Sequence, residues 1–100
     1  MIGGSTPTNT FRLPFDTSML SSVRIVYAQD DEILITREKG DCTLDGNTIT
    51  VTLTQEETLR FDYQKILEIQ GHFLTLGGDA LVSKPKQITV EKFLDREVLV

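Results

Sequence analysis

The side chains best suited to chemistry are few in this sequence and lie far apart. His72 is the only histidine among 100 residues, and Cys42 is the only cysteine. If His72 lies on an extended strand, it shares a face with Glu68, and the two residues are about 13 Å apart. That separation is too large for both side chains to bind one metal ion. We therefore interpret His72 as a polar residue on a half-exposed strand face, and not as a metal ligand or an acid–base group.

The other candidates fit structural roles better than chemical ones. Cys42 follows Asp41 and has no cationic neighbour that would favour the reactive thiolate, so we expect a free, partly buried thiol. The run Asp30-Asp31-Glu32 lacks the Asp-x-Asp-x-Asp-Gly spacing of a calcium loop and is typical of a solvated hairpin tip. Gly77-Gly78 is not followed by the Gly-Lys-Ser/Thr of a phosphate loop, so we expect a turn there. The sequence predicts no catalytic residue and no cofactor or metal site.

The elements that position these residues are visible in the periodicity of the chain. Residues 48–54 alternate strictly, with Ile49, Val51 and Leu53 on one face and threonines on the other, which predicts a half-buried antiparallel strand. Similar alternation predicts further strands at residues 10–13, 22–29, 32–37, 42–44, 66–76, 80–83 and 87–90. The apolar faces of three strands then predict a common core, formed by Val23, Ile25, Tyr27, Ile49, Val51, Leu53, Leu67, Ile69 and Phe73.

Turn and cap residues punctuate these strands. Asp30-Asp31 joins two β-rich runs as a hairpin, and Asp45-Gly46 precedes the strictly alternating strand as a tight turn. Pro85 cannot donate a hydrogen bond to a ladder, so it marks an edge position or a bulge. Thr54-Gln55-Glu56-Glu57 has the form of a capping box and predicts one short helical turn. A second helical turn is predicted at residues 91–97.

These elements predict one fold class. Short strands, about seven in number, with turns every 8–12 residues are typical of an all-β sandwich. We expect an Ig-like antiparallel β-sandwich with one short helical turn. Residues 10–100 form the single β-sandwich domain in this prediction. Residues 1–9 contain Gly, Ser, Thr and Pro and are predicted to form a flexible N-terminal arm.

Composition limits the class of protein. A chain with 39% hydrophobic and 25% charged residues is typical of a small globular domain and not of a disordered segment. The net charge is −5, and basic residues do not form the patch that a phosphate backbone requires, so nucleic acid is not expected as a partner. No apolar run reaches the roughly 18 residues of a membrane span, and neither a signal peptide nor a membrane partner is expected.

Several segments spread along the chain carry a resemblance to known proteins. They are Thr6-Pro7-Thr8, Thr10-Phe11, Leu13-Pro14-Phe15-Asp16-Thr17-Ser18, Val23-Arg24-Ile25, Ala28-Gln29, Cys42-Thr43-Leu44-Asp45-Gly46-Asn47-Thr48, Leu53-Thr54-Gln55-Glu56-Glu57-Thr58-Leu59, Glu68-Ile69-Gln70, Gly78-Asp79-Ala80-Leu81 and Leu94-Asp95-Arg96-Glu97-Val98-Leu99. Together these segments resemble small prophage-associated proteins of Gram-positive bacteria, a group with no assigned activity. In strand pattern and length the chain is also similar to the Ig-like N-terminal domain of phage baseplate upper proteins.

The resemblance implies a virion-type component and not an enzyme. We expect a non-enzymatic structural or adaptor module that acts through protein–protein contacts, either by self-association or by binding phage structural proteins. It is expected in the cytoplasm or assembled into a phage particle. The alternative is a β-sandwich module that binds a small ligand or glycan, which requires a pocket with converging polar groups.

Overall fold

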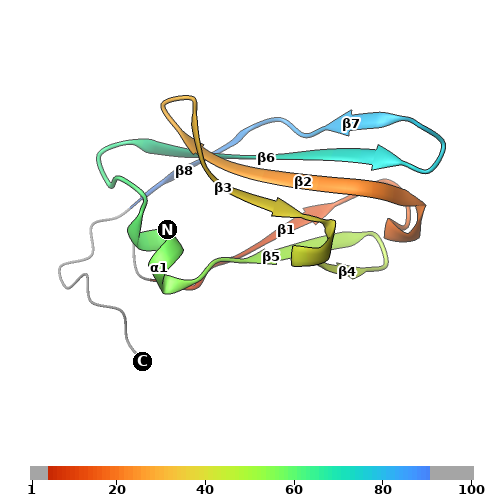
Figure 1. Cartoon of the computed structure of the whole chain (residues 1–100), viewed down its shortest axis with the longest axis horizontal. Helices are drawn as coiled ribbons and strands as arrows, with labels where there is room; N and C mark the ends of the chain where they lie inside the picture. The colour runs from red at the N-terminus through yellow and green to blue at the C-terminus, as the bar shows by residue number, and fades with distance from the viewer. Residues whose placement is uncertain (1–4, 91–100) are drawn as a thin grey trace.

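Two antiparallel β-sheets pack face to face in the computed structural model, which describes residues 5–90 (Figure 1). The first sheet has the strand order β1-β5-β4, with the bounds β1 Thr8–Arg12, β5 Thr48–Thr52 and β4 Thr43–Asp45. The second has the order β3-β2-β6-β7, with the bounds β3 Glu32–Glu38, β2 Leu20–Gln29, β6 Ile66–Thr75 and β7 Ala80–Val82. The prediction of an all-β sandwich is confirmed.

The last strand of the second sheet is interrupted. β8 (Lys86–Thr89) pairs with the first half of β6, while β7 pairs with the second half. Between them Ser83 continues the pairing, because its amide donates to the Gly71 carbonyl at 2.9 Å. Pro85 then breaks the ladder, as expected for a residue without an amide hydrogen. Residues 5–90 therefore form eight strands, which match the eight predicted segments and agree with the predicted number of about seven once β7 and β8 are taken as one interrupted strand.

The strand order is that of an Ig-like sandwich. β1, β5 and β4 take the places of strands B, E and D, and β3, β2 and β6 take those of C′, C and F. β7 and β8 together take the place of strand G. Among residues 5–90, no strand takes the place of strand A beside β1.

Short helical segments connect the sheets. Their bounds are η1 Thr17–Met19, η2 Lys39–Asp41 and α1 Gln55–Leu59. Thr54 caps α1, since the Glu57 amide donates to its hydroxyl at 3.2 Å, and the predicted capping box is confirmed. None of the described helices is long and apolar enough to cross a membrane.

The core lies between the sheets and includes every residue predicted for it. All nine predicted core side chains are at most 5% exposed. The other buried hydrophobic residues are Leu13, Leu20, Ile35, Phe61 and Val90. The β2–β3 hairpin also forms as predicted, with positive φ at Asp30 and Asp31, which turns the chain in two residues.

The predicted flexible arm is wrong for residues 5–9. β1 begins at Thr8, the Pro7 carbonyl accepts from the Leu53 amide at 3.1 Å, and the Ser5 carbonyl accepts from the Thr58 hydroxyl at 2.9 Å. Turn-forming composition was outweighed here by the pairing of β1 with β5 and by hydrogen bonds from the Leu53 amide and the Thr58 hydroxyl. Residues 1–4 and the predicted helical turn at 91–97 lie outside the described residues.

A buried glutamine holds the crossover from α1 to β6. Gln29, at the end of β2, is 4% exposed. Its Nε2 donates to the carbonyls of Asp62 and Lys65 at 2.8 and 3.1 Å, and its Oε1 accepts from the Asp62 amide at 2.8 Å. The Gln29 side chain thus supplies the hydrogen-bond partners that the backbone groups of this loop would otherwise find in a β-sheet.

Candidate functional site

His72 and Cys42 lie on different parts of the fold, and among residues 5–90 neither has a catalytic partner at hydrogen-bond distance. His72 is exposed on the outer face of β6, in register with Arg24 of β2 and Val82 of β7. Cys42 is a free thiol whose Sγ donates to the Glu38 carbonyl at 3.3 Å. Burial, and then the negative charge of Asp41, raises the pKa of this thiol. The predicted free, partly buried thiol is confirmed.

The acidic run Asp30-Asp31-Glu32 and the pair Gly77-Gly78 both lie at turns between strands. Asp30 forms an ion pair with Lys65 at 3.1 Å, which joins the hairpin tip to the crossover before β6. Gly78 has a φ of 91° in the turn between β6 and β7, and the Asp79 amide donates to the Thr75 hydroxyl at 3.0 Å. Within residues 5–90, no group of three or more His, Cys, Asp or Glu side chains is placed to hold a metal ion.

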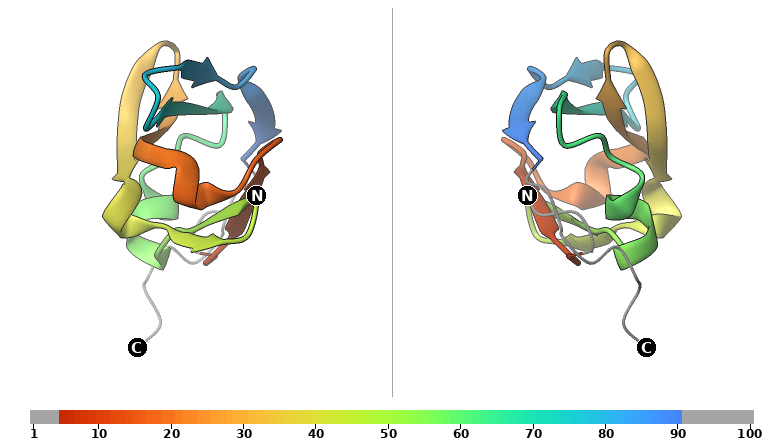
Figure 2. Two further views of the ribbon diagram at one scale, coloured as in Figure 1. Left: turned by 90° about the vertical axis from the view of Figure 1, so that its right-hand side faces the viewer. Right: turned by 90° about the vertical axis from the view of Figure 1, so that its left-hand side faces the viewer.

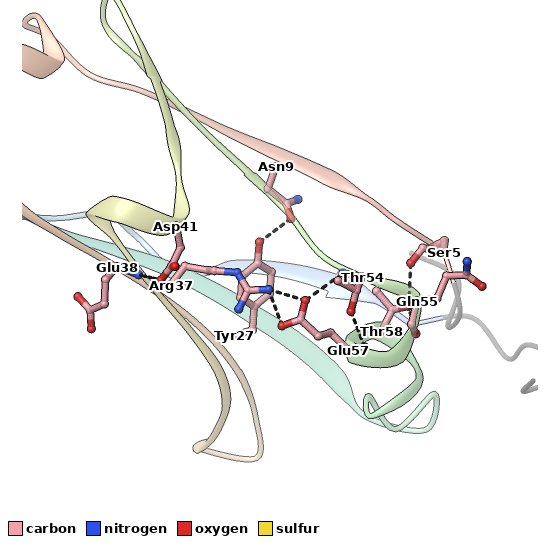
Figure 3. Close-up of polar contacts among 10 residues, drawn as sticks. All are labelled: Ser5, Asn9, Tyr27, Arg37, Glu38, Asp41, Thr54, Gln55, Glu57 and Thr58. Carbon is pink, nitrogen blue, oxygen red and sulfur yellow. Dashed lines mark hydrogen bonds and ion pairs between the residues drawn. The ribbon is translucent and has the colours of Figure 1, made fainter. Parts of the chain in front are cut away.

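A cluster of polar groups anchors α1 to β3 (Figure 3). The Arg37 Nη2 donates to both carboxylate oxygens of Glu57, and the Thr54 amide donates to the same carboxylate at 3.0 Å. Burial opposes the charge of Glu57, but the hydrogen bonds from Arg37 and Thr54 outweigh it and hold the pKa of Glu57 below its ordinary value. The Glu57 hydrogen bond likewise raises the pKa of Arg37.

Tyr27 extends this cluster across the sandwich. Its hydroxyl donates to the Asn9 Oδ1 at 2.8 Å, so a strand of each sheet contributes one partner (Figure 3). Burial raises the pKa of Tyr27, which keeps the phenol protonated. In the part of the chain that the structure describes, every buried side-chain nitrogen or oxygen has a hydrogen-bond partner. The cluster therefore stabilises the fold and leaves none of these buried groups free to bind a substrate.

A shallow depression, here called the outer-face hollow, lies on the second sheet. It has a volume of about 460 Å³ and mixes charged and apolar residues. Its lining consists of Arg24, Val26, Ala28, Asp31, Ile33, Glu68, Gln70, His72 and Pro85. Two of its polar groups are already engaged, since Arg24 pairs with Glu38 at 3.2 Å and the Gln70 Nε2 donates to the Ser83 carbonyl at 2.9 Å.

The outer edge of β1 presents backbone groups that pair with no strand in the described part of the chain. The Leu13 amide donates to the Asn47 carbonyl at 2.8 Å, and the Leu53 amide donates to the Pro7 carbonyl at 3.1 Å. In an antiparallel ladder the bonds to one neighbour fall on every second residue, so β5 is bonded by the odd-numbered residues of β1. The amides and carbonyls of Thr8, Thr10 and Arg12 consequently point away from β5, toward an edge that no strand within residues 5–90 covers.

This edge faces the last strand of the other sheet. Figure 2 shows β1 and β8 side by side where the sandwich is open. The space between them is a groove of about 260 Å³, here called the β1–β8 groove. It is lined by Asn9, Thr10, Phe11, Arg12, Ile69, Ser83, Lys84 and Lys86.

Comparisons with protein-family models, curated proteins and solved structures found no match. Function must therefore be inferred from the geometry of the chain.

Sequence reasoning missed the β1–β8 groove. Lys84 and Lys86 lie two residues apart in the sequence, as Arg37 and Lys39 do, but their position opposite Arg12 depends on how two distant strands pack. Pro7 and Pro14, which bracket β1, were the local signal of an edge strand, because proline is tolerated at sheet edges and strand ends.

Proposed function

We propose that this domain is a non-enzymatic structural or adaptor module, of phage or prophage origin, that acts through protein–protein contacts. The observation that carries the proposal is the outer edge of β1, at Thr8, Thr10 and Arg12, which no strand within residues 5–90 pairs. An open edge of this kind accepts a strand from another chain, with backbone hydrogen bonds providing affinity and alternate side chains providing specificity. The resemblance to prophage-associated proteins supports the virion-type role.

On the described surface, the candidate catalytic side chains are not brought together, which agrees with this proposal. His72 lies on β6 and Cys42 lies between η2 and β4, and the partly buried Arg37–Glu57 pair is held by contacts within the fold. Repetition of one weak edge contact in a ring or tube would supply avidity, because each further contact forms at high effective concentration.

The test is co-expression of the domain with the proteins encoded by neighbouring genes, followed by size-exclusion chromatography with light scattering. We expect a stable complex or a concentration-dependent oligomer in the wild type. Thr10→Pro removes an outward-facing amide donor and should abolish that complex, because an added strand loses this hydrogen bond. The pairing of β1 with β5 should remain, because that ladder does not use the Thr10 amide. Thr10→Ala is the matched control, since it removes the side chain and keeps the donor.

Two results would count against the proposal. One is a domain that stays monomeric and alone at every concentration and with every neighbouring protein. The other is a substrate turnover or metal-dependent activity that disappears in His72→Ala or Cys42→Ala.

A second candidate function is the binding of a small ligand or glycan in the outer-face hollow. The observation that favours it is the presence of Glu68, Gln70 and His72 beside an apolar floor of Val26 and Ala28. Titration of the ¹⁵N-labelled protein with a panel of oligosaccharides tests it. Saturable chemical-shift changes confined to the amides of β2 and β6 would support this function. Uniform or absent chemical-shift changes would exclude it for that panel.

A further inference from the structure

We propose that the β1–β8 groove is the docking site and that its occupant is an acidic, extended segment of a partner protein. This inference rests on the proposed function and specifies which edge is used and what chemistry the partner has. The added strand would pair with the outer edge of β1 and take the place of strand A, which no strand within residues 5–90 occupies.

The backbone of β1 supplies the register of the contact. Thr8, Thr10 and Arg12 present their amides and carbonyls outward, in the alternate spacing that a second antiparallel or parallel strand requires. β1 is five residues long, so the complementary segment needs about five to seven residues in extended conformation.

The charge of the groove selects an acidic partner. Of the ten Lys and Arg residues in the sequence, eight lie within residues 5–90, and three of these line the groove, namely Arg12, Lys84 and Lys86. Among the described residues, none of the three has a carboxylate at ion-pair distance, whereas Arg24, Arg37 and Lys65 do. In a chain of net charge −5, three unpaired cations in one groove form a local positive field.

The lining also provides an apolar contact. Phe11 is only partly buried and packs edge-on against Phe73, with ring centroids 6.1 Å apart, so part of its ring is available to a partner. Lys86 pairs with Ile69 across the β6–β8 ladder, so its side chain leaves the same face of the sheet and lies toward the groove. A segment that alternates carboxylate and β-branched residues matches both the cations and the apolar contacts.

A competing role for the same lysines is protection of the edge against aggregation, a common function of Lys and Pro on edge strands. The two roles predict opposite results. Protection predicts that loss of the positive charge increases self-association, while docking predicts that it removes the binding of an acidic strand.

The experiment uses the full chain, labelled with ¹⁵N, and two synthetic peptides. The probe is acetyl-Thr-Glu-Val-Glu-Val-Glu-Thr-amide, and the matched control peptide carries Lys in place of each Glu. We expect the acidic peptide to slow hydrogen exchange of the Thr8, Thr10 and Arg12 amides and the basic peptide to leave them unchanged. Added salt should weaken the binding, because the attraction between exposed charges is screened.

Charge-reversal variants then distinguish the effect of the groove lysines on peptide binding from the effect of net charge. Lys84→Glu with Lys86→Glu should weaken peptide binding at least about tenfold, which corresponds to about 1.4 kcal/mol. Arg60→Glu with Lys65→Glu makes the same change of net charge, at residues that line neither the groove nor the outer-face hollow, and should weaken binding much less. Circular dichroism verifies that each variant is folded.

The outcomes distinguish this inference from the proposed function. If the domain associates with neighbouring gene products but the Lys84 and Lys86 variants bind them normally, the groove assignment is wrong and the adaptor role stands. If these variants instead form larger oligomers than the wild type, the lysines protect the edge and the docking site is refuted. If the amides of β1 are protected in the free chain and insensitive to the peptide, the chain itself covers the edge and the inference fails.

Discussion

The carboxylate of Glu57 accepts hydrogen bonds from Arg37 of β3 while it also accepts from the Thr54 amide at the start of α1. One side chain therefore closes the capping box and ties the only described α-helix to the edge of the opposite sheet. The two partners are 18% and 14% exposed, so water screens their attraction less than it would at an open surface.

Glu57→Gln should lower the free energy of unfolding at neutral pH by about 2 kcal/mol, the usual scale for a hydrogen bond to a charged group. Because folding lowers the pKa of Glu57 from 4.5, its contribution is present above about pH 4.5 and is lost as the pH falls through the folded value. The wild type should therefore lose more stability than Glu57→Gln between pH 7 and pH 3. Urea unfolding across this range measures the difference. Glu56→Gln, an exposed neighbour in α1, is the control, and an equal loss in both Gln variants would contradict the role of the ion pair.

Thr54→Ala should lower the free energy of unfolding by about 1 kcal/mol, because the Glu57 amide loses the hydroxyl that accepts its hydrogen bond at 3.2 Å. Chemical unfolding of the variant beside Thr43→Ala, an exposed threonine of β4, measures the effect. If both variants had the same stability as the wild type, the cap would contribute nothing.

Ile69→Ala should lower the free energy of unfolding by about 2–5 kcal/mol, since the side chain is 1% exposed and its removal leaves a cavity between the sheets. Ile66→Ala, in the same strand but 54% exposed, should cost much less. Denaturant unfolding of the pair tests the assignment of faces along β6. A loss below about 1 kcal/mol for Ile69→Ala would mean that its face is not the packed one.

Gly71→Ala should lower the free energy of unfolding by about 1–3 kcal/mol through overpacking. A Cβ at this position would lie 2.5 Å from the Cζ of Phe73, and the ring cannot move freely because it also packs against Phe11. Gly77→Ala is the control, since its nearest contact would be the Thr75 hydroxyl at 3.9 Å. Thermal unfolding compares the two, and equal midpoints would show that the ring adjusts at no cost.

Local pattern was sufficient to predict most of the secondary structure. The alternation of Ile49, Val51 and Leu53, the two-residue turn at Asp30-Asp31 and the capping box at Thr54 each depend on neighbours within a few residues. For this reason the strands, the hairpin and α1 lie where the sequence predicts them, with bounds that differ by a few residues. The same local rules misplaced residues 5–9, because the partners that order Ser5 and Pro7 are Thr58 and Leu53, more than forty residues away.

The sequence alone thus determined the class of fold and the inward face of each core strand, because side-chain periodicity and turn chemistry are properties of short segments. Only the tertiary structure decided which polar groups meet: Tyr27 with Asn9, Arg37 with Glu57, and Gln29 with the loop at Asp62. It also decided that the open edge of β1 faces the lysines before and at the start of β8. These pairings follow from how two sheets pack across a shared core, and no spacing along the chain encodes that packing.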